Sequence, residues 1–365
     1  HPAAEPAREA RAYWLDRRLV QWPGAKTDGA ARFRLYHSAT AQLRATIGRP
    51  VSGADGHLGL QQAKVEMTAA LAERYKFIGE GPRLLLDAAD AAALPALLRG
   101  QLLLVREDEA GRVLDATALQ TPGVLDDLYA AADTVTLGAH RYGQPAISGS
   151  IALDFATRFA LWAPTARAVA VCLYSNDTRA LPARQDETSG VWTLDLPGAL
   201  HGQRYAYLVD VFVPGVGIVR NRATDPYSVG LTADSKRSVV LDLDNASTKP
   251  EGWDTAVRPA PLASPTDMTI YELHVRDFSI ADKTVRPAWR GKYLAFTEAD
   301  AAGMRHLRGL GDAGMTDVHL LPVFDIATVP ERDCATPAIP AAAPDSEAQQ
   351  AASSAVAAKD CFNWG

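Results

Sequence analysis

Four polar side chains in the last third of the chain could take part in acid and base chemistry. They are Glu272, His274, Asp277 and Asp325. They lie within or just after two apolar segments, residues 268–275 and 317–324. Carboxyl and imidazole groups act as general acids and bases, and enzymes built on parallel strands place such groups at the strand ends.

Structural roles compete with that chemistry. Glu272 and His274 alternate with apolar residues, so we expect them to be satisfied polar groups packed between strand and helix. Asp277 follows Arg276, and we expect it to pair with that arginine and to cap the loop after its strand. Asp325 directly follows the second segment and remains the best candidate to line a cleft.

The elements that position these residues follow the pattern of a parallel sheet. Residues 268–275 and 317–324 are near-continuous apolar segments, which predicts buried strands. Between them, Thr297 to about Leu310 predicts a helix, with the threonine as its N-cap and acidic residues in its first turn. Strand, helix and strand form a βαβ unit. Because two parallel strands are too few to fold alone, we expect them to belong to a larger domain.

The first 125 residues predict a mostly-β domain. Residues 13–15, 32–36 and 101–105 have the composition or the alternation of strands, whereas residues 90–98 are rich in Ala and Leu and predict a helix. Residues 126–148 are rich in turn residues and suit a linker.

The next domain has the pattern of a β-sandwich. Alternating residues along three successive segments each define one strand face. The faces are Phe155, Thr157, Phe159 and Leu161, then Val169, Val171 and Leu173, then Tyr205, Tyr207, Val209 and Val211. We assign residues 149–245 to this sandwich, 246–266 to a second linker and 267–365 to the incomplete α/β domain.

Composition and charge exclude several classes of function. The 365 residues are 47% hydrophobic and 22% charged, with a formal net charge of -6 and no clustering of Lys and Arg, so nucleic acid is not an expected partner. No apolar run is long enough to predict a membrane span. The start, HPAAEP, suits a mature exported protein, and it equally suits a chain shortened before expression.

Several segments, in order, resemble the pullulanases and limit dextrinases of the α-amylase superfamily. The segment 271–279 reads YELHVRDFS, and RGKYL (290–294), HLLPVFD (319–325) and the final NWG follow it. Upstream, FALWAPTA (159–166), TDPYS (224–228), AYWL (12–15) and GVLDD (123–127) resemble the borders of the two β domains in that family.

The resemblance implies a multidomain protein. Its parts are a mostly-β N-terminal domain, a starch-binding-like β-sandwich and the start of a (β/α)8 barrel. The implied reaction is hydrolysis of α-1,6-glucosidic linkages in pullulan, amylopectin and limit dextrins with retention, which needs a pair of carboxyl groups about 5 Å apart. The family carries its acids in motifs resembling DVVYNH and DGFRFD, and neither occurs here. The chain is therefore expected to be inactive alone.

Alternatives to this function remain open. The chain could be a non-catalytic α-glucan-binding module, or a relative of isoamylases and branching enzymes. The resemblance identifies no cofactor, although the intact enzyme could hold calcium, and it implies an α-glucan as partner. It also favours a secreted or periplasmic protein.

Candidate glucan contacts follow from the resemblance. Asn363 and Trp364 match positions beside the family's substrate cleft, where an indole stacks on a sugar and an amide binds hydroxyls; core packing of Trp364 is the alternative. In the sandwich, four aromatic residues could form a glucan platform, but their alternation within strands favours the core. These are Trp162, Trp192, Tyr205 and Tyr207.

The cysteines predict a cross-link rather than a metal site. Cys172, Cys334 and Cys361 have no CxxC or Cys/His spacing. Cys334 and Cys361 bracket an Ala/Pro/Ser-rich segment, residues 330–359, which predicts a long loop. We expect a disulfide across it if the protein is exported.

Overall fold

The chain divides into two compact units. The residues described by the computed structural model are 9–27, 31–143, 155–324, 329–335 and 337–361. Unit 1 comprises residues 1–231 and 237–248, and unit 2 comprises residues 232–236 and 249–365.

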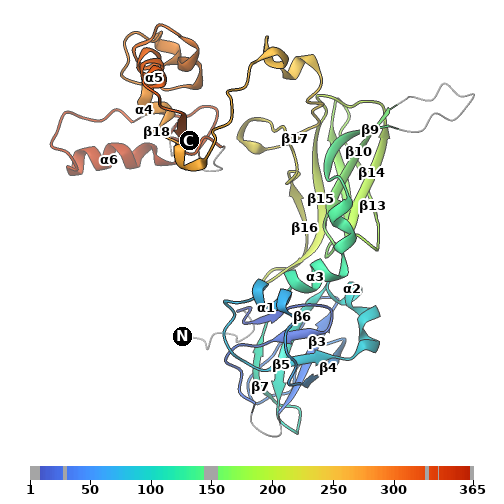
Figure 1. The fold of residues 1–365 in the computed structure, drawn as a ribbon. Helices are drawn as coiled ribbons and strands as arrows, with labels where there is room; N and C mark the ends of the chain where they lie inside the picture. The colour runs from blue at the N-terminus through green and yellow to red at the C-terminus, as the bar shows by residue number, and fades with distance from the viewer. Residues whose placement is uncertain (1–8, 28–30, 144–154, 325–328, 336, 362–365) are drawn as a thin grey trace, which may run out of the picture. The chain divides into compact units, whose positions relative to one another are not determined.

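Within the described residues, the N-terminal part of unit 1 contains an eight-stranded sheet in the order β7-β6-β3-β4-β5-β2-β1-β8 (Figure 1). Its strands are β1 (Ala12–Trp14), β2 (Leu19–Gln21), β3 (Arg32–Ser38), β4 (Gly56–Gln62), β5 (Arg83–Leu86), β6 (Gln101–Glu107), β7 (Val113–Thr117) and β8 (Leu119–Gln120). The short helices are α1 (Ala69–Arg74), η1 (Ala88–Ala93), α2 (Leu94–Leu97), α3 (Pro122–Leu128) and η2 (Ala130–Thr134). The predicted mostly-β domain is confirmed.

Alternation along β3 explains how this sheet buries one face. Phe33 and Leu35 are buried in a core that also holds Trp14, Trp22 and Leu104. Full burial of such a side chain contributes roughly 1.5–3 kcal/mol relative to exposure. The predicted helix at residues 90–98 is instead a 3-10 helix, η1, that continues into the single turn α2.

A buried acid joins two strands of the same sheet. Glu107 at the end of β6 is fully buried, and its carboxylate pairs with Arg34 Nη1 at 3.1 Å. It also accepts a hydrogen bond from the hydroxyl of Tyr36 on β3. Burial raises the pKa of Tyr36, so the tyrosine remains a donor. A buried carboxylate requires such partners, because removing one of them leaves an uncompensated charge.

The second part of unit 1 is a β-sandwich. One sheet has the order β13-β14-β10-β9, and the other has the order β12-β11-β15-β16 with β17 paired to β15 (Figure 1). The strands are β9 (Gly138–Gly143), β10 (Phe155–Trp162), β11 (Ala168–Tyr174), β12 (Arg179–Pro182), β13 (Arg184–Gln185), β14 (Val191–Pro197), β15 (Arg204–Val213), β16 (Gly217–Ala223) and β17 (Ser238–Val239). Both sheets contribute to one core, with Phe159 and Trp192 from the first and Val171, Tyr205 and Tyr207 from the second.

The segment predicted as the first linker is partly built into this sandwich. β9 lies within residues 126–148 and pairs antiparallel with β10, so that Gly138 is opposite Ala160. Tyr129 is buried, and a Cβ on Gly190 would lie only 2.9 Å from its ring. Turn residues such as Gly138, with φ +90°, suggested a linker, but the hydrogen bonds of β10 impose a strand on the residues after it.

Unit 2 contains the predicted βαβ unit. β18 (Ile270–Leu273) and β19 (Asp317–Leu320) are parallel, and α5 (Ala302–Asp312) connects them. The other helices of the unit are η3 (Ala233–Ser235), η5 (Trp253–Thr255), η6 (Pro265–Asp267), α4 (Val275–Ser279), η7 (Pro287–Trp289), η8 (Tyr293–Thr297), α6 (Glu347–Val356) and η9 (Ala357–Lys359). η4 (Ala246–Thr248) belongs to unit 1.

The elements of unit 2 differ in length from their predictions. Both strands are shorter than the apolar segments that predicted them. β18 ends at Leu273 because His274 caps α4 and Val275 starts this helix, and β19 ends at Leu320. The expected loop at 330–359 contains α6, which Ser346 caps by accepting the N–H of Gln349. The sequence analysis did not predict α4 and α6. α4 is short and α6 is rich in Ala and Ser, and neither has a strong apolar stripe in the sequence.

The predicted cap of α5 was wrong. Thr297 ends η8, and α5 begins five residues later with Ala301 at its N-cap, which offers no side-chain acceptor. The first amides of α5 are instead bound from upstream: Ala302 donates to Thr284 Oγ1 at 2.7 Å, and Gly303 donates to Asp282 Oδ2 at 3.2 Å. A non-local cap of this kind has no signature at the helix start.

Replacing Asp282 with Asn should loosen the first turn of α5, because a neutral amide accepts hydrogen bonds more weakly than a carboxylate. Hydrogen bonds from Thr284 lower the pKa of Asp282. The stabilisation is therefore present above the ordinary aspartate pKa of about 3.9 and is lost as pH falls through the lower folded value. Amide hydrogen exchange in α5 should be faster in Asp282→Asn at pH 7, and the difference should shrink in acid.

The matched control is Asp267→Asn, since Asp267 is exposed on η6 and binds no helix amide of α5. Equal exchange in α5 for both variants at pH 7 would contradict the capping role of Asp282.

Candidate functional site

Three of the polar residues singled out from the sequence lie on β18 or in the α4 segment that directly follows it. Glu272 on β18 lies opposite His319 on β19, with Oε2 and Nδ1 3.2 Å apart, and both side chains are exposed. His274 Nδ1 accepts the backbone N–H of Arg276 at 3.2 Å and so caps α4. Asp277 forms an ion pair with Arg276 at 2.9 Å, as predicted. His274 and Asp277 thus have local structural roles.

None of the three residues expected to contact substrate belongs to the part of the chain that the structure describes. Asp325, Asn363 and Trp364 lie outside the described residues. A neighbour that the sequence reasoning missed is Tyr293, which is exposed and donates its hydroxyl to the carbonyl of Val323 at 3.1 Å. It therefore lies beside the chain that follows β19.

The RGKYL segment that contains Tyr293 is held in place by backbone geometry. Gly291 has φ +71°, and its N–H is donated to the buried hydroxyl of Ser279 at 2.9 Å. Arg290 donates to the carbonyls of Val285 and Lys283. The signal in the sequence that could have identified Tyr293 is that it is the aromatic residue of the RGKYL segment.

A disulfide joins Cys334 to Cys361, with 4.9 Å between the two Cα atoms. It closes the loop that contains α6, and the N–H of Ala335 donates to the carbonyl of Lys359 beside it. The predicted cross-link is present. Cys172 is a buried free cysteine of the sandwich.

The aromatic residues of the sandwich belong to its interior. Trp192, Tyr205 and Tyr207 are buried, and Trp162 is half-buried. The indole N–H of Trp162 donates to the carbonyl of Ser189 at 3.1 Å, and that of Trp192 donates to the carbonyl of Ala163 at 2.9 Å. Because three of the four rings are buried and both indole N–H groups are bonded within the domain, these residues do not form a glucan platform.

A buried carboxylate organises the segment TDPYS. Asp225 Oδ2 accepts the hydroxyl of Tyr205 at 2.7 Å, and Oδ1 accepts the N–H of Tyr227 at 2.8 Å. Its own N–H donates to Ser238 Oγ at 2.8 Å. Burial raises the pKa values of Asp225, Tyr205 and Tyr207. The motif that resembled a domain border is thus a structural junction.

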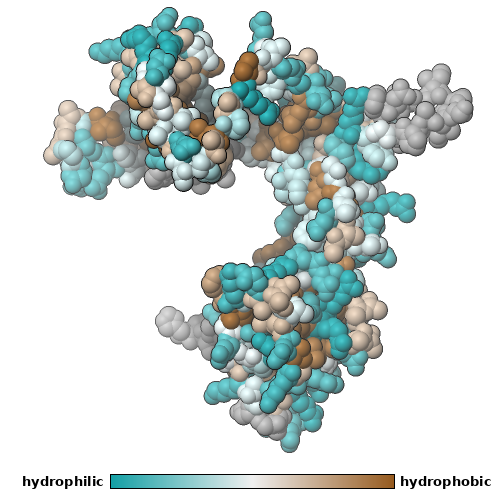
Figure 2. Space-filling model, in the orientation of Figure 1, coloured by the Kyte–Doolittle hydropathy of each residue, from teal (hydrophilic) through white to brown (hydrophobic). Residues whose placement is uncertain are grey.

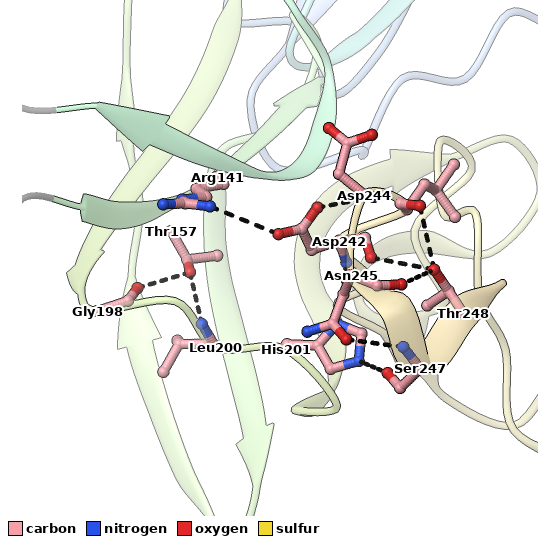
Figure 3. A network of polar contacts seen from close by, with 11 residues as sticks. Arg141, Thr157, Gly198, Leu200, His201, Asp242, Asp244, Asn245, Ser247 and Thr248 are labelled. Carbon is pink, nitrogen blue, oxygen red and sulfur yellow. Dashed lines mark hydrogen bonds and ion pairs between the residues drawn. The ribbon is translucent and has the colours of Figure 1, made fainter. Parts of the chain in front are cut away.

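A second polar network lies where the chain leaves the sandwich, with residues 240–248 beside the turn that precedes β15 (Figure 3). His201 Nδ1 accepts the N–H of Asp242 at 3.0 Å, and its Nε2 lies 3.2 Å from Ser247 Oγ. Since Nδ1 accepts a hydrogen bond, the proton of the neutral ring lies on Nε2, which donates a hydrogen bond to Ser247 Oγ. Arg141 of β9 faces the carboxylate of Asp242 at 3.7 Å. The contacts anchor the chain after β17 to the sandwich.

Metal binding has no candidate among the residues that the structure describes. There, no three His, Cys, Asp or Glu side chains gather in a way that could hold an ion. Calcium in the intact enzyme stays a prediction. In the same part of the chain, no helix is long and apolar enough to cross a membrane.

Two family matches cover most of unit 1. Residues 9–127 match the pullulanase N2 domain, and residues 136–228 match carbohydrate-binding module 48, also described as the isoamylase N-terminal domain. Across 98% of its length the chain is 35% identical to pullulanase 1 of Arabidopsis thaliana, a chloroplastic protein, and across 88% it is 35% identical to the pullulanase of Klebsiella pneumoniae.

The chain belongs to the pullulanase family. It spans about a third of the length of these curated relatives, 36% of the plant protein and 28% of the bacterial one. Its structure is similar to PulA from Klebsiella oxytoca, with a TM-score of 0.78 and 32% identity over 100% of this chain and 34% of that chain. A Klebsiella pneumoniae pullulanase complexed with maltotriose gives 0.76 and 32% over 89% of this chain and 30% of that chain.

Replacing Asp225 with Ala should destabilise unit 1, because the buried hydroxyl of Tyr205 and the amide of Tyr227 would both lose their acceptor. The expected loss is about 2 kcal/mol or more, since each buried unsatisfied group costs roughly 1–3 kcal/mol. Tyr205→Phe should cost less, because it removes one donor and leaves the other two contacts of Asp225 in place. Denaturant unfolding followed by tryptophan fluorescence measures both, and a Tyr205→Phe variant that is the less stable of the two would contradict the central role of Asp225.

Proposed function

We propose that the complete protein is a debranching glycoside hydrolase that cleaves α-1,6-glucosidic linkages in pullulan, amylopectin and limit dextrins with retention. The observation that carries this proposal is the order of domains along the chain. A pullulanase N2 domain is followed by a carbohydrate-binding module 48 and then by a βαβ unit, and 98% of the chain is 35% identical to a pullulanase. Retention requires a nucleophilic carboxylate and an acid/base carboxyl group about 5 Å apart. The motifs expected to carry them do not occur in residues 1–365.

We further propose that β18 and β19 are the first strands of a (β/α)8 barrel. Parallel sheets are ordinarily covered on both faces. In the described chain, apolar residues of this pair are instead exposed, with Ile270 53% and Val318 49% accessible. Exposed apolar residues on both strands support further strands and helices around them, and they argue against a stand-alone glucan-binding module.

Asp325, Asn363 and Trp364 are the proposed substrate contacts. Asp325 follows β19 by a few residues, on the side where barrel enzymes place their sites. The Cys334–Cys361 disulfide supports the proposal that the protein is exported, because such bonds persist in oxidising compartments. It also supports the proposal that the chain just before Asn363 is tethered to the segment after β19.

The complete protein should release linear maltooligosaccharides from pullulan and from branched dextrins. Reducing-end assays on pullulan and on linear amylose measure the preference, and faster cleavage of amylose would refute debranching. Residues 1–365 alone should give no turnover, because their sequence lacks the motifs expected to carry the acid pair.

Trp364→Ala in the complete protein should raise KM or lower kcat on branched substrate with little change in Tm, because a ring that faces a sugar loses little core packing. A buried tryptophan would instead cost roughly 3–5 kcal/mol on truncation. The matched control is Trp253→Ala, which removes a tryptophan that is 64% exposed on η5 and should change neither quantity. A large fall in Tm with unaltered kinetics would assign Trp364 to the core.

A further inference from the structure

A cleft of about 610 Å³ in unit 1 is lined by two short segments of different character. One wall is the loop Thr40–Thr46 after β3, with Gln101 at the start of β6. The other wall comes from the hairpin of β15 and β16, namely Phe212 and residues 215–218. The volume lies within the range of about 300–1,000 Å³ that small-molecule sites occupy.

The loop wall is polar and is held rigidly from three directions. The side chain of Gln101 accepts the N–H of Leu43 at 2.8 Å, and Ser38 Oγ accepts the N–H of Gln42 at 3.3 Å. Gly53 approaches so closely that a Cβ there would lie 2.0 Å from the carbonyl oxygen of Gln42. Because contacts with Ser38, Gly53 and Gln101 already hold the backbone of this loop, the loop loses little conformational entropy when it binds a ligand.

One residue of this loop is strained. Ala41 has φ +60°, a conformation that residues with a Cβ adopt at a cost of order 1–3 kcal/mol. Such strain persists only where the surroundings determine it. Here it places the side chains of Thr40 and Gln42, both exposed, along the cleft.

The hairpin wall is apolar. Phe212 and Ile218 are directly opposed in the β15–β16 register, so their side chains lie together on one face. Val216 at the tip is 70% exposed, between two glycines with positive φ, Gly215 and Gly217. Turn tips are ordinarily polar. The apolar side chain of Val216 at this tip therefore extends the apolar wall that Phe212 and Ile218 form.

Arg167, which does not line the cleft, links residues that flank its two walls. Arg167 donates its backbone N–H to the carbonyl of Asp210 on β15 at 2.7 Å, and its Nη1 donates to the carbonyl of Ala39 at 2.7 Å. Asp210 is in turn held by Arg220 of β16 through two contacts at 2.6 and 2.7 Å. One arginine thus joins the loop and the hairpin at the edge of the cleft.

We propose that this cleft is a binding site for α-linked gluco-oligosaccharides. A pyranose ring has an apolar face of C–H groups and a rim of hydroxyls, so it matches a site with an apolar plate on one side and amide and hydroxyl groups on the other. The plate is Phe212, Ile218 and Val216, and the polar rim is Thr40 and Gln42. The choice of an α-glucan as ligand rests on the proposed function, whereas the cleft itself rests on the contacts above.

The test is calorimetric titration of residues 1–365 with maltohexaose, with cellohexaose as the β-linked comparison. Ile218→Ser and Gln42→Ala each change one wall at a partly or fully exposed position. Each should weaken binding of maltohexaose about tenfold, which corresponds to about 1.4 kcal/mol. The matched control is Phe77→Ser, which removes a side chain that is 92% exposed and does not line the cleft; its Kd should equal that of the parent.

A fluorescent reporter localises the binding. In Phe212→Trp, emission should shift on addition of maltohexaose, and Gln42→Ala in the same background should remove the shift at equal ligand concentration. Binding that both wall variants leave unchanged, or the absence of any binding by the parent chain, would overturn the proposal. Neither result bears on debranching, which the pullulan assay on the complete protein decides separately.

Discussion

The carboxylate of Asp225 is the interaction on which the sandwich depends. Asp225 is buried where three segments meet: its carboxylate accepts hydrogen bonds from Tyr205 of β15 and from Tyr227 of the TDPYS turn, and its backbone N–H donates to Ser238 of β17. A charge in such a place is tolerated only because each oxygen has a donor. The same turn packs against the first sheet, since a Cβ on Gly138 would lie 3.1 Å from the carbonyl oxygen of Tyr227. Asp225 therefore binds β17 directly and holds the turn that packs against β9.

Glu107 plays a comparable part in the N-terminal domain. It is fully buried, and its carboxylate joins Arg34 and Tyr36 of the neighbouring strand. Both β domains thus combine an apolar core with a buried acid: residues of the neighbouring strand bind Glu107, whereas Tyr205 of β15 and Tyr227 of its own turn bind Asp225. Such acids stabilise little in net terms, because desolvation offsets their attraction. They penalise any other strand register, since a shift would leave the charge without partners.

Sequence patterns predicted the elements whose cause is local. The alternation of β3, β10 and β15 and the βαβ order of unit 2 follow from the period of apolar residues. The missed features depend on distant partners: α5 is capped by Asp282 and Thr284, and β9 exists because β10 is beside it. Of the candidate site, the ion pair of Asp277 was predictable from its neighbour Arg276, whereas the role of Tyr293 depends on Val323, thirty residues away. Asp325, Asn363 and Trp364 lie outside the described residues and stay predictions.

The first and last strands of the N-terminal sheet are neighbours. β1 and β8 pair in parallel, so residue 13 lies beside residue 120 although the rest of the domain separates them in sequence. A domain whose ends meet in this way can be inserted into a chain, or lost from it, while the flanking parts stay close together. The parallel pair therefore gives protein engineers a natural place to excise the domain or to graft it onto another chain.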